Sequence, residues 1–175
     1  MGVIFSMSYY KEIVTKAVIG KGKKTTKEKR VIDLNQSVDN VLGCWVINHS
    51  FGGIYDNGNL FINGSYDVHI WYSFDNNSKT NVLIKRFDYK DRMNVSIKEN
   101  GTLSNNSGLI VRALSQPSVI DVKVENNTIE LIVEKQMGME VVGDAKVRVT
   151  VTDEEDDYEE LINEDDIDIN DNYLN

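Results

Sequence analysis

Hydrophobic and polar residues alternate along most of the chain after Val41. In residues 66–72, 120–125 and 145–152, every second side chain is apolar or aromatic. Successive side chains of a β-strand point to opposite faces, so this period of two predicts strands with one buried face. The longest clean example is the last one, where Val147, Val149 and Val151 share a face.

Residues that favour turns separate these stretches. Asn and Gly favour turns because they tolerate positive φ, and Pro interrupts a strand because it cannot donate a hydrogen bond to the neighbouring strand. The turn signals are Asp56–Asn59, Asn63-Gly64, Asp75–Ser78, Asn100-Gly101 and Asn126-Asn127, and Pro117 is expected to end a strand. About eight or nine short strands without long helical segments between them are typical of an antiparallel fold. We therefore predict an all-β protein, an antiparallel β-sandwich or barrel-like domain, over residues 8–152.

The N-terminal region has a different pattern. Residues 1–7 are expected to form an extension. Beyond them, Tyr10, Ile13, Val14 and Ala17 fall at helical spacing, which predicts a short helix over residues 9–18 capped by Ser8. Gly20 and Gly22 are expected to end it.

Composition supports the β assignment and limits the classes of protein to which the chain can belong. The chain of 175 residues has 20 Val and 17 Ile against 3 Ala, which excludes helical bundles because β-branched residues favour strands. No apolar run reaches about 18 residues, so direct membrane insertion is not expected. A single cysteine and the lack of a signal-peptide pattern favour a protein made in a reducing compartment.

Charged residues are distributed unevenly, and they divide the chain into a basic part and an acidic C-terminal segment. Residues 153–175 hold 12 of the 28 acidic groups and no basic group, so residues 1–152 retain 16 acidic and 19 basic groups, a net charge of +3. The acidic segment is expected to be a disordered tail, because it has too few apolar residues to form a core. A stretch from Lys16 to Arg30 carries seven basic residues and one acid, Glu28.

These oppositely charged segments suggest a mechanism of self-association. We expect the basic stretch of one molecule to attract the acidic tail of another, an interaction that salt screens. The candidate interaction residues are Lys16, Lys21, Lys23, Lys24, Arg30, Asp153, Glu154, Glu155, Asp156, Asp157, Glu159 and Glu160, together with Trp71. For each segment the simpler alternative is a solubilising surface.

Candidate catalytic groups are few. A metal site from Cys44, His49 and His69 is conceivable, but Cys44 and His49 are five residues apart on one predicted strand and would point to opposite faces. The run around Cys44 is typical of a core strand, in which a thiol behaves as a small apolar group. No phosphate-binding loop or nucleophile elbow is present, so we expect no catalytic residue, metal or cofactor. Trp45 is expected in the core. Trp71 is expected on the face opposite Val68 and Ile70, where it is a candidate contact with another protein.

Several strings of the sequence resemble one family. They are Met7–Val18, Leu42–His49 (LGCWVINH), Gly64–Ser73 (GSYDVHIWYS), Gln116-Pro117 and Glu140–Val147, followed by the acidic C-terminus. Together they are similar to the outer spore coat morphogenetic protein CotE family of endospore-forming bacteria. The resemblance covers roughly residues 7–151 and the tail.

This resemblance implies a structural protein and no enzyme. It implies synthesis in the mother-cell cytoplasm, then deposition in the outer spore coat around the forespore. Its implied partners are further copies of itself, basement-layer proteins and outer coat proteins, with no nucleic acid. The alternative from the residues themselves is a carbohydrate- or ligand-binding β-sandwich that uses Trp71 and Tyr72. An enzyme acting through Cys44 is the third possibility.

Overall fold

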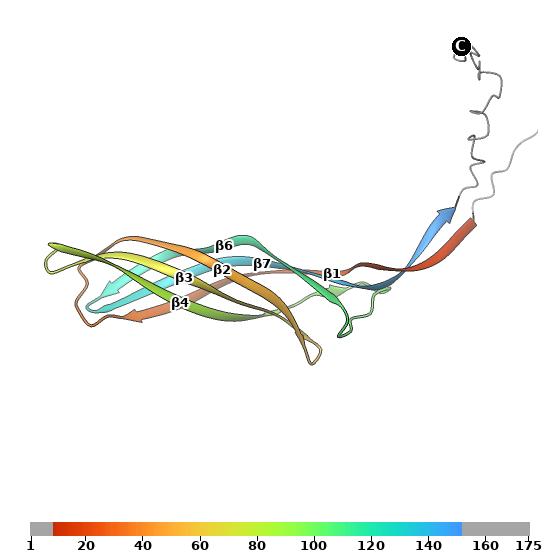
Figure 1. Cartoon of the computed structure of the whole chain (residues 1–175), viewed down its shortest axis with the longest axis horizontal. Helices are drawn as coiled ribbons and strands as arrows, with labels where there is room; N and C mark the ends of the chain where they lie inside the picture. Colours follow the sequence, from red (N-terminus) through yellow and green to blue (C-terminus); the bar gives the residue numbers. More distant parts are fainter. Residues whose placement is uncertain (1–8, 152–175) are drawn as a thin grey trace, which may run out of the picture. The chain divides into compact units, whose positions relative to one another are not determined.

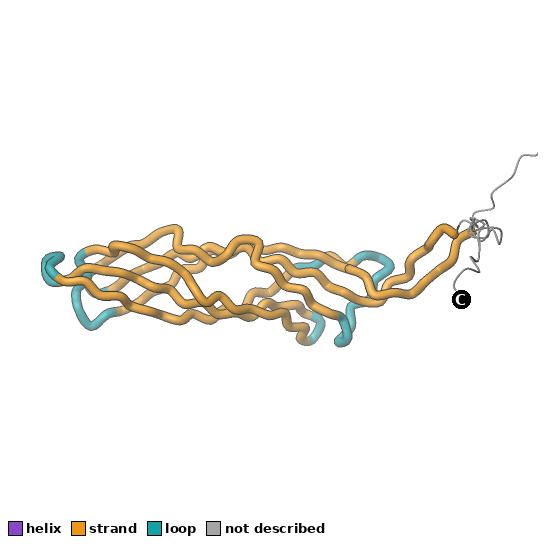
Figure 2. Tube along the Cα trace, turned by 45° about the horizontal axis from the view of Figure 1, so that its top comes forward, coloured by secondary structure: helices purple, strands orange, loops and turns teal. Residues whose placement is uncertain are grey.

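The computed structural model describes residues 9–151, and in this range every regular element is a β-strand (Figures 1 and 2). The strands are β1 (Tyr9–Asp33), β2 (Asn40–Asp56), β3 (Asn59–Phe74), β4 (Lys79–Met93), β5 (Ser96–Ile97), β6 (Gly108–Glu125) and β7 (Thr128–Val151). Residues 14–146 form one unit, whereas residues 9–13 and 147–151 belong to a second. Across the described residues, no helix is long and apolar enough to span a membrane.

The strands of the described region form two sheets. One has the order β5-β1-β7-β6 and the other the order β2-β3-β4. The pairs β1–β5, β2–β3, β3–β4 and β6–β7 are antiparallel. The prediction of an all-β, antiparallel protein is therefore confirmed.

One hydrophobic core, within residues 14–146, lies between the two sheets. Ile62, Val68 and Ile70 of β3 are fully buried, as are Leu131 and Val141 of β7. All five belong to a single cluster. Fully burying each such side chain stabilises the fold by about 1.5–3 kcal/mol. Two antiparallel sheets that share one core fit a β-sandwich.

The predicted helix over residues 9–18 is wrong, because these residues begin β1. Ile13, Val14 and Val18 are β-branched and suit a strand as well as the helical pattern. The decision comes from tertiary structure, because β7 lies next to β1 in the sheet and offers it a hydrogen-bonding partner.

Gly20 and Gly22 also do not end an element, since β1 continues through them. A Cβ on Gly20 would lie 2.7 Å from a side-chain carbon of Ile97, and one on Gly22 would lie 2.4 Å from the carbonyl oxygen of Asn94. These glycines allow the segment around β5 to approach β1.

The turn predictions succeed where the chain reverses between paired strands, and Asp75–Ser78 joins β3 to β4 with positive φ at its first three residues. Asn57-Gly58 joins β2 to β3 with positive φ at both positions, and Asn126 has positive φ in the β6–β7 turn. Asn63-Gly64, in contrast, lies inside β3. Pro117 does not end a strand either, because β6 continues past it with shifted register on both sides. Fewer and longer strands result than the turn signals predict.

Candidate functional site

Two tryptophans lie on the outer face of the β2-β3-β4 sheet. Trp45 pairs with His69 and Trp71 pairs with Val82, so these side chains share the face opposite the core. Both residues are 43% exposed. Three further exposed apolar residues on this face complete a surface that we call the tryptophan face: Trp45, Ile47, Trp71, Val82 and Ile84.

Gly43 lies between the two indoles. A Cβ at this position would be 3.1 Å from the Trp45 ring and 3.8 Å from the Trp71 ring. The Trp45 ring also lies 5.9 Å from the His69 ring, measured between centroids. The indoles are therefore separated only by a residue without a side chain. Exposed apolar patches that include Trp are typical of protein–protein contacts.

The prediction that Trp45 lies in the core is wrong. Its neighbours Cys44 and Val46 pair with Ile70 and Val68 on the inner face, which turns Trp45 outward. The outward placement of Trp71 is confirmed. Tyr72 is only 4% exposed and faces the core, so Trp71 and Tyr72 do not form one sugar-binding surface.

Polar groups border the tryptophan face. Asp67 accepts a hydrogen bond from Asn48 at 2.8 Å and another from Arg86 at 3.0 Å. The Asn48 hydrogen bond, followed by the Arg86 charge, lowers the pKa of the Asp67 carboxyl. A charged rim around an apolar centre is the usual anatomy of an interface.

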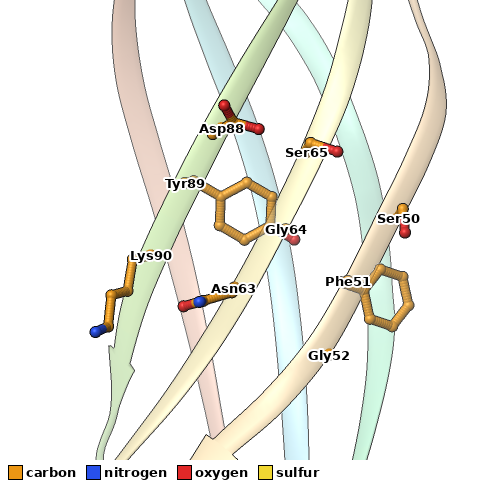
Figure 3. Close-up of a pocket in the computed structure, with 9 residues that line it drawn as sticks. All are labelled: Ser50, Phe51, Gly52, Asn63, Gly64, Ser65, Asp88, Tyr89 and Lys90. Atoms are coloured by element: carbon orange, nitrogen blue, oxygen red, sulfur yellow. The ribbon is translucent and has the colours of Figure 1, made fainter.

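Further along the same outer face is an open hollow of about 700 Å³ (Figure 3). It is lined by three residues from each strand of this sheet: Ser50, Phe51 and Gly52 of β2, Asn63, Gly64 and Ser65 of β3, and Asp88, Tyr89 and Lys90 of β4. The lining contains no cysteine or histidine.

Tyr89 lies directly beside Gly64 on the neighbouring strand (Figure 3). Its hydroxyl is 2.7 Å from Nε2 of His49, and Nδ1 of His49 is 2.7 Å from Oε1 of Gln116. Because an amide oxygen only accepts, a neutral His49 donates from Nδ1 and accepts the tyrosine proton at Nε2. Burial lowers the pKa of His49, which favours this neutral form.

A charged cluster lies inside the sandwich, between β1, β4 and β7. Lys135 is 1% exposed, and its Nζ lies 2.9 Å from Oε1 of Glu28 and 3.2 Å from Oδ2 of Asp91. The same ammonium lies 4.0 Å from the centroid of the Tyr89 ring. Burial, together with the Asp91 and Glu28 carboxylates, raises the pKa of the Tyr89 hydroxyl. We interpret this cluster as structural, since the Lys135 ammonium lies within ion-pair distance of both carboxylates.

Arg30 belongs to this inner cluster. It pairs with Glu28, and its Nε lies 3.3 Å from the Tyr66 hydroxyl. Burial alone would lower the pKa of Arg30, but the contacts with Tyr66 and Glu28 outweigh it and raise the pKa. Lys24 also turns toward this side, with its Nζ 3.2 Å from the carbonyl oxygen of Arg92 and 3.9 Å from Asp91.

Four other lysines of β1 form a ladder of ion pairs with β7. The pairs are Lys16–Asp144 at 2.8 Å, Lys21–Glu140 at 2.8 Å, Lys27–Glu134 at 3.1 Å and Lys29–Glu130 at 2.6 Å. We call this set the charge ladder. Among the described residues Lys23 has no ion-pair partner, and its side chain is exposed. The sequence did not reveal the ladder, because its partners lie about 100 or more residues apart.

Cys44 lies on the inner face opposite Ile70 and is half-buried. Burial raises the pKa of its thiol to about 11, so it is a poor nucleophile near neutral pH. His69 lies on the outer face and His49 is engaged with Tyr89 and Gln116. Within residues 9–151, no group of three potential ligands is placed to hold a metal.

The remaining predicted interaction residues, which form the acidic tail from Asp153 to Glu160, lie outside the described residues. So do the predicted extension over residues 1–7 and Ser8.

Comparison with known proteins gives one result. The family model described as "Outer spore coat protein E (CotE)" matches residues 9–175, which is most of the chain. Neither the search of curated proteins nor the search of solved structures returned a match.

Proposed function

This chain belongs to the outer spore coat protein E (CotE) family, and from that premise we propose that it is a scaffold that self-associates and recruits other proteins to the outer spore coat. Membership makes it an outer spore coat protein of a structural family. Under this proposal it is made in the mother-cell cytoplasm and then docks on basement-layer proteins around the forespore.

The observation that supports this role is the tryptophan face. Five large apolar side chains remain exposed on a sheet whose other face already covers the core. Leaving two indoles in water is unfavourable unless a partner covers them. The Asp67–Arg86 rim would then fix the orientation of that partner.

We assign residues 8–152 as the assembly domain, residues 153–175 as an acidic recruiting tail and residues 1–7 as an extension. Attraction between the basic stretch and the tail of another molecule remains part of the proposal. The charge ladder neutralises four lysines of that stretch within the chain, so we expect this attraction to steer encounters and the apolar contact to hold them.

Substitution of Trp71 tests the scaffold role. Trp71→Ala removes a large exposed side chain from the centre of the tryptophan face, and a central interface tryptophan contributes about 2 kcal/mol or more. We expect the concentration at half-assembly to rise about 30-fold, measured by sedimentation velocity and light scattering.

The matched control is Ile120→Ala, which removes an exposed apolar side chain from β6 in the other sheet. It should leave assembly unchanged, and both variants should keep the melting temperature of the parent chain. A parent chain that stays monomeric at all concentrations, or a Trp71→Ala chain that assembles normally, would contradict the proposal.

A further inference from the structure

An apolar groove crosses the outer face of the other sheet, over β1, β7 and β6. Its volume is about 390 Å³. Gly138 of β7 lies at its centre, and Ile110 and Leu114 of β6 form one side with exposed side chains. The groove lies entirely within residues 14–146.

The groove exists because Gly138 has no side chain. Its register partner is Arg112, and a Cβ on Gly138 would be 3.2 Å from Leu114. Any larger residue at 138 would fill the space beside Leu114. The result is a slot that can take an aliphatic or aromatic side chain.

The rim of the groove is basic. Lys21 and Lys23 line it from β1 and Arg112 lines it from β6, against one carboxylate, Glu140. Lys21 lies 2.8 Å from Glu140, whose pKa is lowered by this hydrogen bond and by the Lys21 charge. Three cations and one anion leave a net charge of about +2 around an apolar slot.

We propose that this groove binds the acidic C-terminal segment, residues 153–175, of a second copy of the chain. This inference rests on the proposed self-association and gives it a second contact. The segment has the matching chemistry, since Ile167 stands between Asp166 and Asp168, and Ile169 follows Asp168. Such a residue places an apolar side chain in the slot and carboxylates against the cationic rim.

A second copy is the favoured source of the segment. After Glu140, β7 continues through residues 141–146 away from the groove. The chain therefore leaves its own groove before the acidic segment begins.

Peptide binding tests the groove directly. The receptor is the full chain carrying Ile167→Ser and Ile169→Ser, so that its own segment does not compete. The probe is a fluorescent peptide of residues 153–175, followed by anisotropy. In this receptor, we expect Gly138→Leu and Arg112→Glu each to weaken binding about tenfold or more. Lys123→Glu, a charge reversal elsewhere on β6, should change it less than about twofold.

A peptide with Ile167 and Ile169 replaced by Ser keeps its charge and should lose most of its affinity. Equal affinity of the two peptides, or equal effects of Gly138→Leu and Lys123→Glu, would overturn the inference. Circular dichroism and thermal melting of each receptor variant establish that its fold is retained.

Mixing distinguishes a second copy from the same chain. A Gly138→Leu chain has an intact segment, and the Ile167→Ser/Ile169→Ser chain has an intact groove. Together they should form a one-to-one complex in sedimentation, with both carrying Trp71→Ala to remove the other contact. Failure to form it would overturn docking between copies. If the peptide fails to bind while assembly remains dependent on Trp71, only this inference falls.

Discussion

At the residue scale, Gly64 determines how Tyr89 reaches His49. A Cβ on Gly64 would lie 2.4 Å from the Tyr89 hydroxyl, so even alanine displaces the ring and its hydrogen bond. We expect Gly64→Ala to lower the free energy of unfolding by about 1–3 kcal/mol, the usual range for overpacking. Urea denaturation measures this free energy.

Gly52→Ala, with no atom within 4 Å of the new methyl group, is the control and should change stability by less than about 1 kcal/mol. Equal effects of the two substitutions would show that Tyr89 is not held by this contact.

At the element scale, Lys135 connects β7 to β1 and β4 through its contacts with Glu28 and Asp91. Lys135→Met leaves two carboxylates inside the sandwich without their shared cation. Removing one partner of a buried ion pair costs about 3–5 kcal/mol, and the nearby Lys24 and Arg30 should keep the loss near the lower value. Chemical denaturation monitored by tryptophan fluorescence measures it.

The matched control for Lys135 is Lys27→Met in the charge ladder. The Lys27 side chain is 62% exposed and pairs with Glu134 at the surface. Exposed pairs contribute about 0–1 kcal/mol, so this variant should unfold close to the parent. A Lys135→Met chain as stable as the Lys27→Met chain would mean that the inner cluster is not stabilising.

At the scale of the whole molecule, the separation of charge should control the rate of assembly. Residues 1–152 carry a net charge of +3 and residues 153–175 carry 12 acidic groups, so attraction between copies is screened by salt. Raising ionic strength from about 0.05 M to about 1 M should slow the initial increase in light scattering at least about tenfold. A chain lacking residues 153–175 should assemble slowly at both ionic strengths. The same salt dependence with and without the segment would remove it from the mechanism.

The sequence by itself determined the all-β class, the family resemblance and the tight turns at Asn57-Gly58 and Asn126. Each of these depends on neighbouring residues, because the period of two and the tolerance for positive φ are local properties. It also determined that Trp71 lies opposite Val68 and Ile70, since alternation along one strand fixes relative faces.

Only the tertiary structure decided whether a local pattern forms a helix or a strand, and which face of each strand is buried. Residues 9–18 fit both a helix and a strand, and the neighbouring β7 selects the strand. Trp45 is exposed because the second sheet covers the other face of β2. The charge ladder and the groove at Gly138 join residues far apart in the chain. They could not be predicted from the sequence, because no local pattern predicts which strands will be neighbours. The interaction surfaces therefore depend on strand order, which folding fixes through the shared core.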